Sequence, residues 1–221
     1  MKRLTLVVSF AFFMLMGLTP APQAQAAGES KAVAGTAPTM SATDLRNGMR
    51  KLWTEHVVYT RMFIISALAG LPDLPTVTQR LLRNQEDIGN AVKPIYGEEA
   101  GKKLSALLRD HILIAADIVK AAKASNTKAV EAGQKKWRAN ADDISAFLAA
   151  ANTIWKKPML TEMLYKHLDL TTSEVVARIK ADWPADLVAY DTGYDHMLMF
   201  ADMLSDGIIK QNPKKVIISE K

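Results

Sequence analysis

The sequence of 221 residues contains no cysteine, only 7% aromatic residues and no block of like charges. Without cysteine the chain can form no disulfide, no thiolate-held zinc or iron–sulfur centre and no cysteine nucleophile. The net charge of +5 is spread along the chain, so we expect no binding to nucleic acid. Phosphate-binding glycine loops and the short motifs of serine hydrolases and zinc proteases are also missing. The sequence names no reaction, and we lean against an enzyme.

The first 26 residues have the layout of a secretory signal peptide. Lys2 and Arg3 precede an apolar run from Leu4 to Leu18, and Ala24-Gln25-Ala26 matches a cleavage site. The apolar run of about 15 residues is shorter than the roughly 20 residues of a bilayer-spanning helix. We expect cleavage after Ala26, membrane contact only during export, and a periplasmic or secreted protein; a retained anchor is the alternative.

Beyond this segment, residues 27–40 are small, polar and interrupted by glycine and proline, which predicts a short flexible linker. From residue 41 onward, apolar residues recur with the period of an α-helix. Ser41 and Asp182 mark helix starts, whereas Gly70 and Pro94 mark helix ends. The predicted helices span about 41–69, 74–93, 98–123, 127–150, 158–180 and 182–211.

Short links between long helices are typical of antiparallel neighbours in a bundle. The sequence therefore predicts an all-α fold over residues 41–212. We expect an antiparallel bundle of about six helices, built from three helical hairpins and followed by a C-terminal tail at 213–221.

The inward stripe of every predicted helix carries one polar residue near its middle. These residues are 27 to 29 positions apart, so each helix and its loop return the chain to the same height. They are His56, Asn84, His111, Asn140, His167 and His196. Asp87 and Asp143 accompany the two asparagines in an Asn-x-x-Asp-Ile run that occurs twice, 56 residues apart. We interpret this pattern as an internal repeat of helical hairpins.

Such a layer must find partners, because an unpaired buried polar group costs roughly 1–3 kcal/mol. One hypothesis is a metal centre, since imidazoles and carboxylates suit zinc, iron, manganese or copper and bundle cores often hold such sites. The predicted metal ligands are His56, His111, His167, His196, Asp87 and Asp143. A second hypothesis is a small ligand held with the help of Asn84 and Asn140. The expected function is therefore binding of a metal ion or small ligand inside the bundle.

Two alternatives stay open. The polar layer can be a purely structural hydrogen-bonded network in a non-catalytic scaffold or interaction protein. A less favoured alternative is a helical enzyme that uses the histidines as general acid and base. A ferritin-type di-metal site is disfavoured, because no inward Glu-x-x-His pair occurs in the sequence.

Three runs of the sequence resemble a family of small bacterial all-helical proteins. These runs are LRNQEDIGN at 82–90, YGEEAG at 96–101 and DHILIA at 110–115, within a likeness that covers residues 45–212. The family is functionally uncharacterised, and its members often carry transferred names such as glycosyltransferase or acetylglutamate kinase. The chain departs from the family at 152–158, where members tend toward an Asn-Pro-Asn-Trp-Pro loop. The resemblance implies a helical bundle and leaves the function open.

Overall fold

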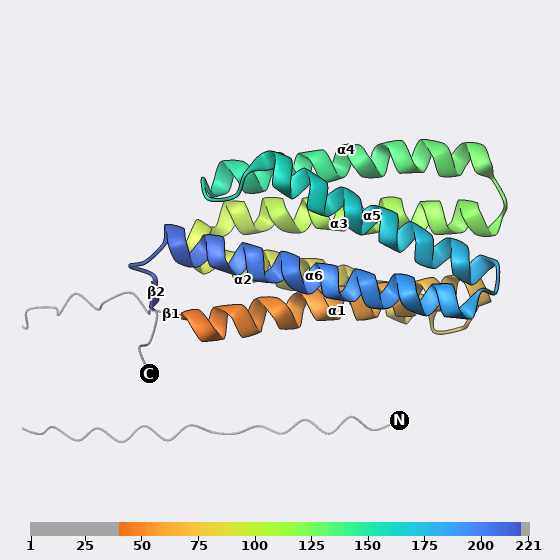
Figure 1. Cartoon of the computed structure of the whole chain (residues 1–221), viewed down its shortest axis with the longest axis horizontal. Helices are drawn as coiled ribbons and strands as arrows, with labels where there is room; N and C mark the ends of the chain where they lie inside the picture. Colours follow the sequence, from red (N-terminus) through yellow and green to blue (C-terminus); the bar gives the residue numbers. More distant parts are fainter. Residues whose placement is uncertain (1–39, 218–221) are drawn as a thin grey trace, which may run out of the picture. The chain divides into compact units, whose positions relative to one another are not determined.

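A computed structural model describes residues 40–217 of the chain. The expected signal peptide (1–26), residues 27–39 of the expected linker and residues 218–221 lie outside the described part. The described elements are β1 (Met40–Ser41), α1 (Ala42–Ala69), α2 (Leu74–Tyr96), α3 (Glu98–Lys123), α4 (Thr127–Ala151), α5 (Lys157–Ile179), α6 (Trp183–Gln211) and β2 (Val216–Ile217). The predicted all-α fold is confirmed (Figure 1). None of these six helices is long and apolar enough to cross a membrane.

Most helix boundaries lie where the sequence predicts them, because local groups satisfy the free backbone atoms at helix ends. The side chain of Ser41 accepts a hydrogen bond from the backbone N–H of Asp44 over 3.0 Å, at the start of α1. Asn126 and Asp182 cap α4 and α6 in the same way. Gly97 alone connects α2 to α3, with a φ of 90° that other residues rarely adopt. The positions of these turns therefore follow from local chemistry.

One predicted boundary is wrong, because α2 does not end at Pro94 but continues to Tyr96. Proline removes one backbone N–H donor and usually ends or kinks a helix. Here Pro94 is exposed, whereas the next residue, Ile95, is buried in the core. The carbonyl of Ile95 also accepts a hydrogen bond from Lys215 Nζ over 2.7 Å. Packing of the last turn thus outweighs the loss of one backbone hydrogen bond.

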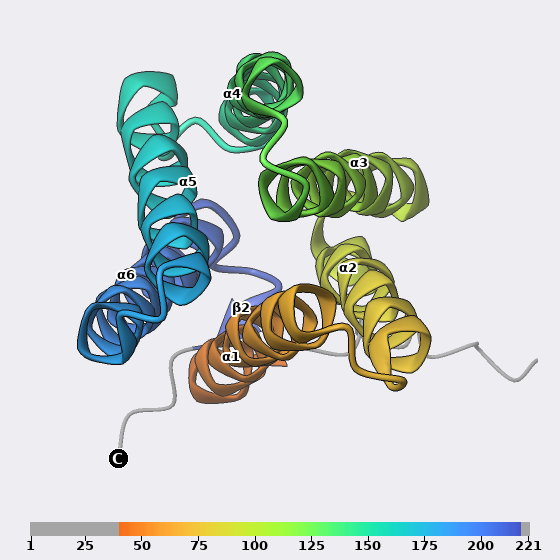
Figure 2. The ribbon, with the colours of Figure 1, turned by 90° about the vertical axis from the view of Figure 1, so that its right-hand side faces the viewer.

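The six helices form a closed ring, which Figure 2 shows end-on. Each helix packs against the next one in sequence, and α6 packs back against α1. The larger buried apolar cluster includes Trp53, Trp137 and Phe200. A smaller cluster around Phe63 and Ile64 joins α1, α2, α3 and α5. The apolar stripes that the sequence shows therefore face the inside of the ring.

The two ends of the described chain meet in a short parallel strand pair. Met40 pairs with Val216, and the backbone N–H of Met40 donates to the carbonyl of Lys215 over 3.0 Å. Val216 is almost fully buried. Within the described part of the expected tail, Val216 is thus packed into the core, whereas residues 213–215 and 217 are exposed.

The close contact between α2 and α3 gives a first prediction. A Cβ added at Gly89 would lie 2.5 Å from the carbonyl oxygen of Gly101 and would also collide with Ser105 Oγ. We expect Gly89→Ala to lower the free energy of unfolding by about 1–3 kcal/mol, because the backbone of α3 must move away. Urea unfolding followed by circular dichroism measures the change.

Gly48 provides the matched control, because a Cβ added there meets nothing within 4 Å. Gly48→Ala lies in the exposed interior of α1 and should raise the free energy of unfolding by about 0.5–1 kcal/mol. Equal effects of the two substitutions would contradict the proposed close approach of α2 and α3.

Candidate functional site

Three imidazoles meet inside the ring of helices. His56 of α1, His111 of α3 and His167 of α5 are only 2%, 3% and 6% exposed. The centroid of the His167 ring lies 5.6 Å from that of His56 and 5.8 Å from that of His111. The inward stripes of the sequence predict this meeting. The first helix of each hairpin thus contributes one residue to what we call the histidine cluster (His56, His111 and His167).

The second helix of each hairpin uses a polar side chain to bind the backbone of the first helix. The three bonds join Asn84 Nδ2 to the Leu52 carbonyl, Asn140 Nδ2 to the Leu107 carbonyl and His196 Nε2 to the Met163 carbonyl, over 3.0, 3.1 and 2.8 Å. In every hairpin the accepting carbonyl lies four residues before the cluster histidine. The same contact therefore occurs once in each hairpin, at the same height as the cluster.

Asn140 also orients one ring of the cluster. Its Oδ1 lies 2.8 Å from Nδ1 of His111, and its amide nitrogen is engaged with a backbone carbonyl. Oδ1 must accept, so the proton of the neutral His111 ring resides on Nδ1. Asn84 differs, because its Oδ1 accepts a hydrogen bond from Gln85 Nε2 over 3.1 Å. Within residues 40–217, Nδ1 of His56 is buried without a hydrogen-bond partner.

The structure does not bring the two predicted aspartates into this layer. Asp143 is exposed, and Asp87 is half-buried with its carboxylate 3.7 Å from Arg80 Nη1. Three residues turn a helix by about 300°, so each aspartate lies about 60° from its asparagine, at the edge of the stripe. The next residue, Ile88 or Ile144, is buried instead. His196 is also placed differently from the other histidines, because it is half-buried and engaged with the α5 backbone.

Burial keeps the cluster histidines neutral at physiological pH. It lowers the pKa of His56 to about 3, with a further contribution from the charge of His111. Burial lowers the pKa of His111 to about 4, although its bond to Asn140 opposes this shift. The pKa of His167 is also lowered, first by burial and then by the charges of the other histidines. Neutral imidazoles can accept hydrogen bonds or bind metals, but these three are poor proton carriers at pH 7.

The histidine cluster supplies nitrogen donors, yet its geometry does not provide a ready metal site. Within the described residues, no group of three His, Asp or Glu side chains is arranged to hold one ion. The rings of His111 and His167 are stacked, with planes only 20° apart. The metal ligands named from the sequence therefore stay a prediction, and the asparagines hold backbone groups.

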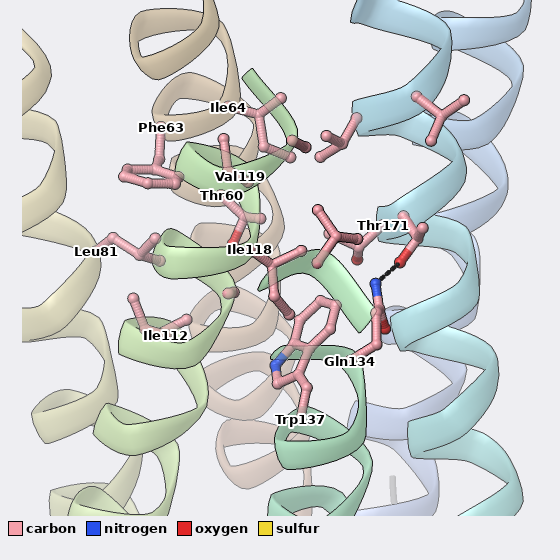
Figure 3. A pocket seen from close by; sticks show the side chains of 16 residues that line it. Thr60, Phe63, Ile64, Leu81, Ile112, Ile118, Val119, Gln134, Trp137 and Thr171 are labelled. Atoms are coloured by element: carbon pink, nitrogen blue, oxygen red, sulfur yellow. Dashed lines mark hydrogen bonds between the residues drawn. The ribbon is translucent and has the colours of Figure 1, made fainter. Parts of the chain in front are cut away.

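A cavity of about 60 Å³ lies among α1 to α5, and Figure 3 shows the side chains that line it. The residues four positions after each cluster histidine, Thr60, Ala115 and Thr171, all line it. Because four residues are about one helical turn, the cavity begins one turn beyond the cluster. The other lining residues are Phe63, Ile64, Leu81, Ile112, Ile118, Val119, Ala122, Val130, Gln134, Trp137, Thr172, Val175 and Val176. The lining within the described chain thus contains no charged side chain.

The polar groups of the lining are the side chains of Thr60, Gln134, Thr171 and Thr172 and the indole N–H of Trp137. Gln134 Nε2 donates to Thr172 Oγ1 over 3.0 Å, a bond that joins α4 to α5 and is drawn in Figure 3. Thr60 Oγ1 is buried and finds no hydrogen-bond partner among residues 40–217. The sequence analysis does not predict this cavity. A signal for it is the His-x-x-x-Thr spacing, which occurs at His56 and Thr60 and again at His167 and Thr171.

A second polar group that the sequence did not predict links α1, α5 and α6. Arg61 contacts Glu174 over 2.7 Å and Asp186 over 3.0 Å, and Arg178 contacts Asp186 over 2.7 Å. Burial raises the pKa of Glu174 to about 7, against the effect of Arg61. Burial also opposes ionisation of Asp186, but the two arginines outweigh it and lower the pKa of this carboxyl. Arg61 is 113 residues from Glu174 and 125 residues from Asp186 in the sequence, so local spacing gives no sign of this contact.

Comparisons with protein-family models, with curated proteins and with solved structures found no match to this chain. The resemblance drawn from the three sequence runs therefore stays a prediction.

The buried titratable groups predict a dependence of stability on pH. In the unfolded chain the histidines take up protons near pH 6.5, whereas in the folded chain their pKa values are lower. The free energy of unfolding should therefore fall as the pH drops from about 6.5 to about 4, by up to about 1.4 kcal/mol per pH unit for each histidine. Chemical unfolding at a series of pH values measures this slope.

Glu174 acts in the opposite direction and serves as the internal control. Its folded pKa of about 7 lies above the unfolded value of 4.5, so its contribution to stability is present below pH 4.5 and is lost as the pH rises to 7. Glu174→Gln removes this opposing contribution and should make the fall in stability below pH 7 steeper. A shallower slope in this variant would show that the assignment of signs is wrong.

Proposed function

We propose that this protein binds a small apolar ligand in the cavity inside its helical bundle. The observation that carries the proposal is the cavity itself, which five helices line almost entirely with apolar side chains. Ligand sites are commonly concave and apolar, with a few polar groups that fix orientation. The sequence also predicts a small ligand inside the bundle, but there the ligand is held with the help of Asn84 and Asn140, which do not line the cavity. Following the signal-peptide pattern of residues 1–26, we place this binding outside the cytoplasm.

The polar layer, which lies one helical turn from the cavity, also supports the proposal. Asn84, Asn140 and His196 are each engaged with a backbone carbonyl of the neighbouring helix. Such bonds fix the height of one helix against the next, since their loss would leave a buried donor and acceptor unpaired. We infer that the layer positions the three hairpins and that the cavity receives the ligand.

The triple occurrence of one contact also supports the internal repeat expected from the sequence. We propose that the three hairpins are equivalent units, each with a cluster histidine on the first helix and a carbonyl-binding residue on the second. In the third unit a histidine takes the place of the asparagine. Three such units arranged about one axis would bring three imidazoles together at one level. They would also place Thr60, Ala115 and Thr171 together one helical turn further on, where the cavity begins.

The size of the cavity favours a slender ligand. Its volume of about 60 Å³ exceeds the roughly 10–15 Å³ that one water needs. It is smaller than the engineered cavity of about 150 Å³ in another protein that accepts benzene. A short hydrocarbon group therefore fits the space better than an aromatic ring.

A cavity-filling substitution tests the proposed function. We expect wild-type protein to bind 1-butanol, measured by titration calorimetry. Ala115→Leu places three further carbons in the cavity and should weaken this binding at least tenfold. The indole of Trp137 lines the cavity, so its fluorescence reports occupancy independently.

The matched control is Ala132→Leu, an equal increase in size at an exposed position of α4 outside the cavity lining. It should bind 1-butanol as the wild type does. Absence of 1-butanol binding by the folded wild type would refute the proposal, and so would unchanged binding by Ala115→Leu.

A further inference from the structure

The lining of the cavity reaches the molecular surface on α5. Among its lining residues in the described chain, Val176 alone is exposed, at 41%. Val130, Gln134 and Thr172 of the lining are half-buried. On the α3 side of α4 the packing is tight, because a Cβ added at Gly133 would lie 2.6 Å from Cγ1 of Ile118. A ligand therefore has its entrance on the α5 side of α4.

Apolar surface continues outward from this entrance along α5. Thr172, Val176 and Ile179 are spaced i, i+4 and i+7, so they share one face of the helix. Thr172 and Val176 line the cavity, whereas Ile179 lies beyond it and is 46% exposed. The face thus passes from the interior of the bundle to solvent at the C-terminal end of α5.

Building on the proposed function, we infer that the ligand is a linear alkyl chain with a polar head group. The end of the chain occupies the cavity, the following methylene groups lie along Val176 and Ile179, and the head group remains in solvent near the end of α5.

The dimensions and chemistry of the site support this class of ligand. A cavity of about 60 Å³ takes only a few carbons, so a longer ligand must extend through the entrance. The described lining offers no charge to a polar head group, whereas exposed apolar side chains outside the entrance offer contacts to methylene groups.

The test measures affinity against chain length in the full protein. Titration calorimetry with 1-alkanols from four to ten carbons should show a gain of up to about fourfold for each added methylene group that is buried. In the variant Ile179→Ser, whose changed residue lies outside the cavity lining, 1-butanol should bind as in the wild type. The gain for the longer alcohols should shrink, because their outer methylenes lose an apolar contact.

Val188→Ser is the control, since Val188 is exposed on α6 and does not line the cavity. This variant should retain the full dependence on chain length. Wild-type binding of 1-butanol with no gain for longer alcohols would overturn the alkyl-chain inference and leave the proposed function standing. Failure of 1-butanol itself to bind would overturn the proposed function. An equal loss in Val188→Ser would indicate surface adsorption and would also overturn the inference.

Discussion

Burial of three imidazoles within one ring of helices requires that they stay neutral. A proton on any one of them would have to be taken out of water and held less than 6 Å from another ring. The neutral state in turn demands defined hydrogen-bond partners, and Asn140 provides one by accepting from Nδ1 of His111. The bonds from the second helix of each hairpin to the first set the height at which the rings meet. The helices are thus held in register by polar contacts at one level, and apolar packing fills the levels on either side.

Closure of the ring depends on a different kind of contact. The first and last hairpins are joined where Arg61 of α1 binds Glu174 of α5 and Asp186 of α6. All three side chains are largely buried, and removal of one partner would leave an uncompensated charge. At the opposite end of α1, the pairing of Met40 with Val216 joins the chain ends. The ion pairs and the strand pairing both join residues that are far apart in the sequence, and together they hold α6 against α1.

The sequence predicts the features that arise within one helix or one turn. The caps at Ser41, Asn126 and Asp182 and the inward direction of His56, His111 and His167 depend only on local spacing and on helical period. Asp87 and Asp143 lie outside the polar layer, because a residue close in sequence to an inward asparagine need not itself point inward. The helix α2 continues past Pro94, because packing of Ile95 outweighs the tendency of proline to end a helix. Arg61, Glu174 and Asp186 could not be paired, since their contact depends on which helices become neighbours. The cavity likewise depends on side chains from five helices.

The cavity one turn beyond the histidine cluster is where the proposed function has a cost in stability. An unfilled space of about 60 Å³ costs about 1.4 kcal/mol at the usual penalty for cavities in protein cores. Larger apolar residues at Thr60, Ala115 and Thr171 would reduce this cost, and neighbouring levels of the same helices do carry large side chains such as Ile64 and Ile112. Small residues at three equivalent positions, one turn beyond three buried histidines, keep the space open at the expense of stability. The proposed binding site accounts for these small residues and for the exposed face of Val176 and Ile179.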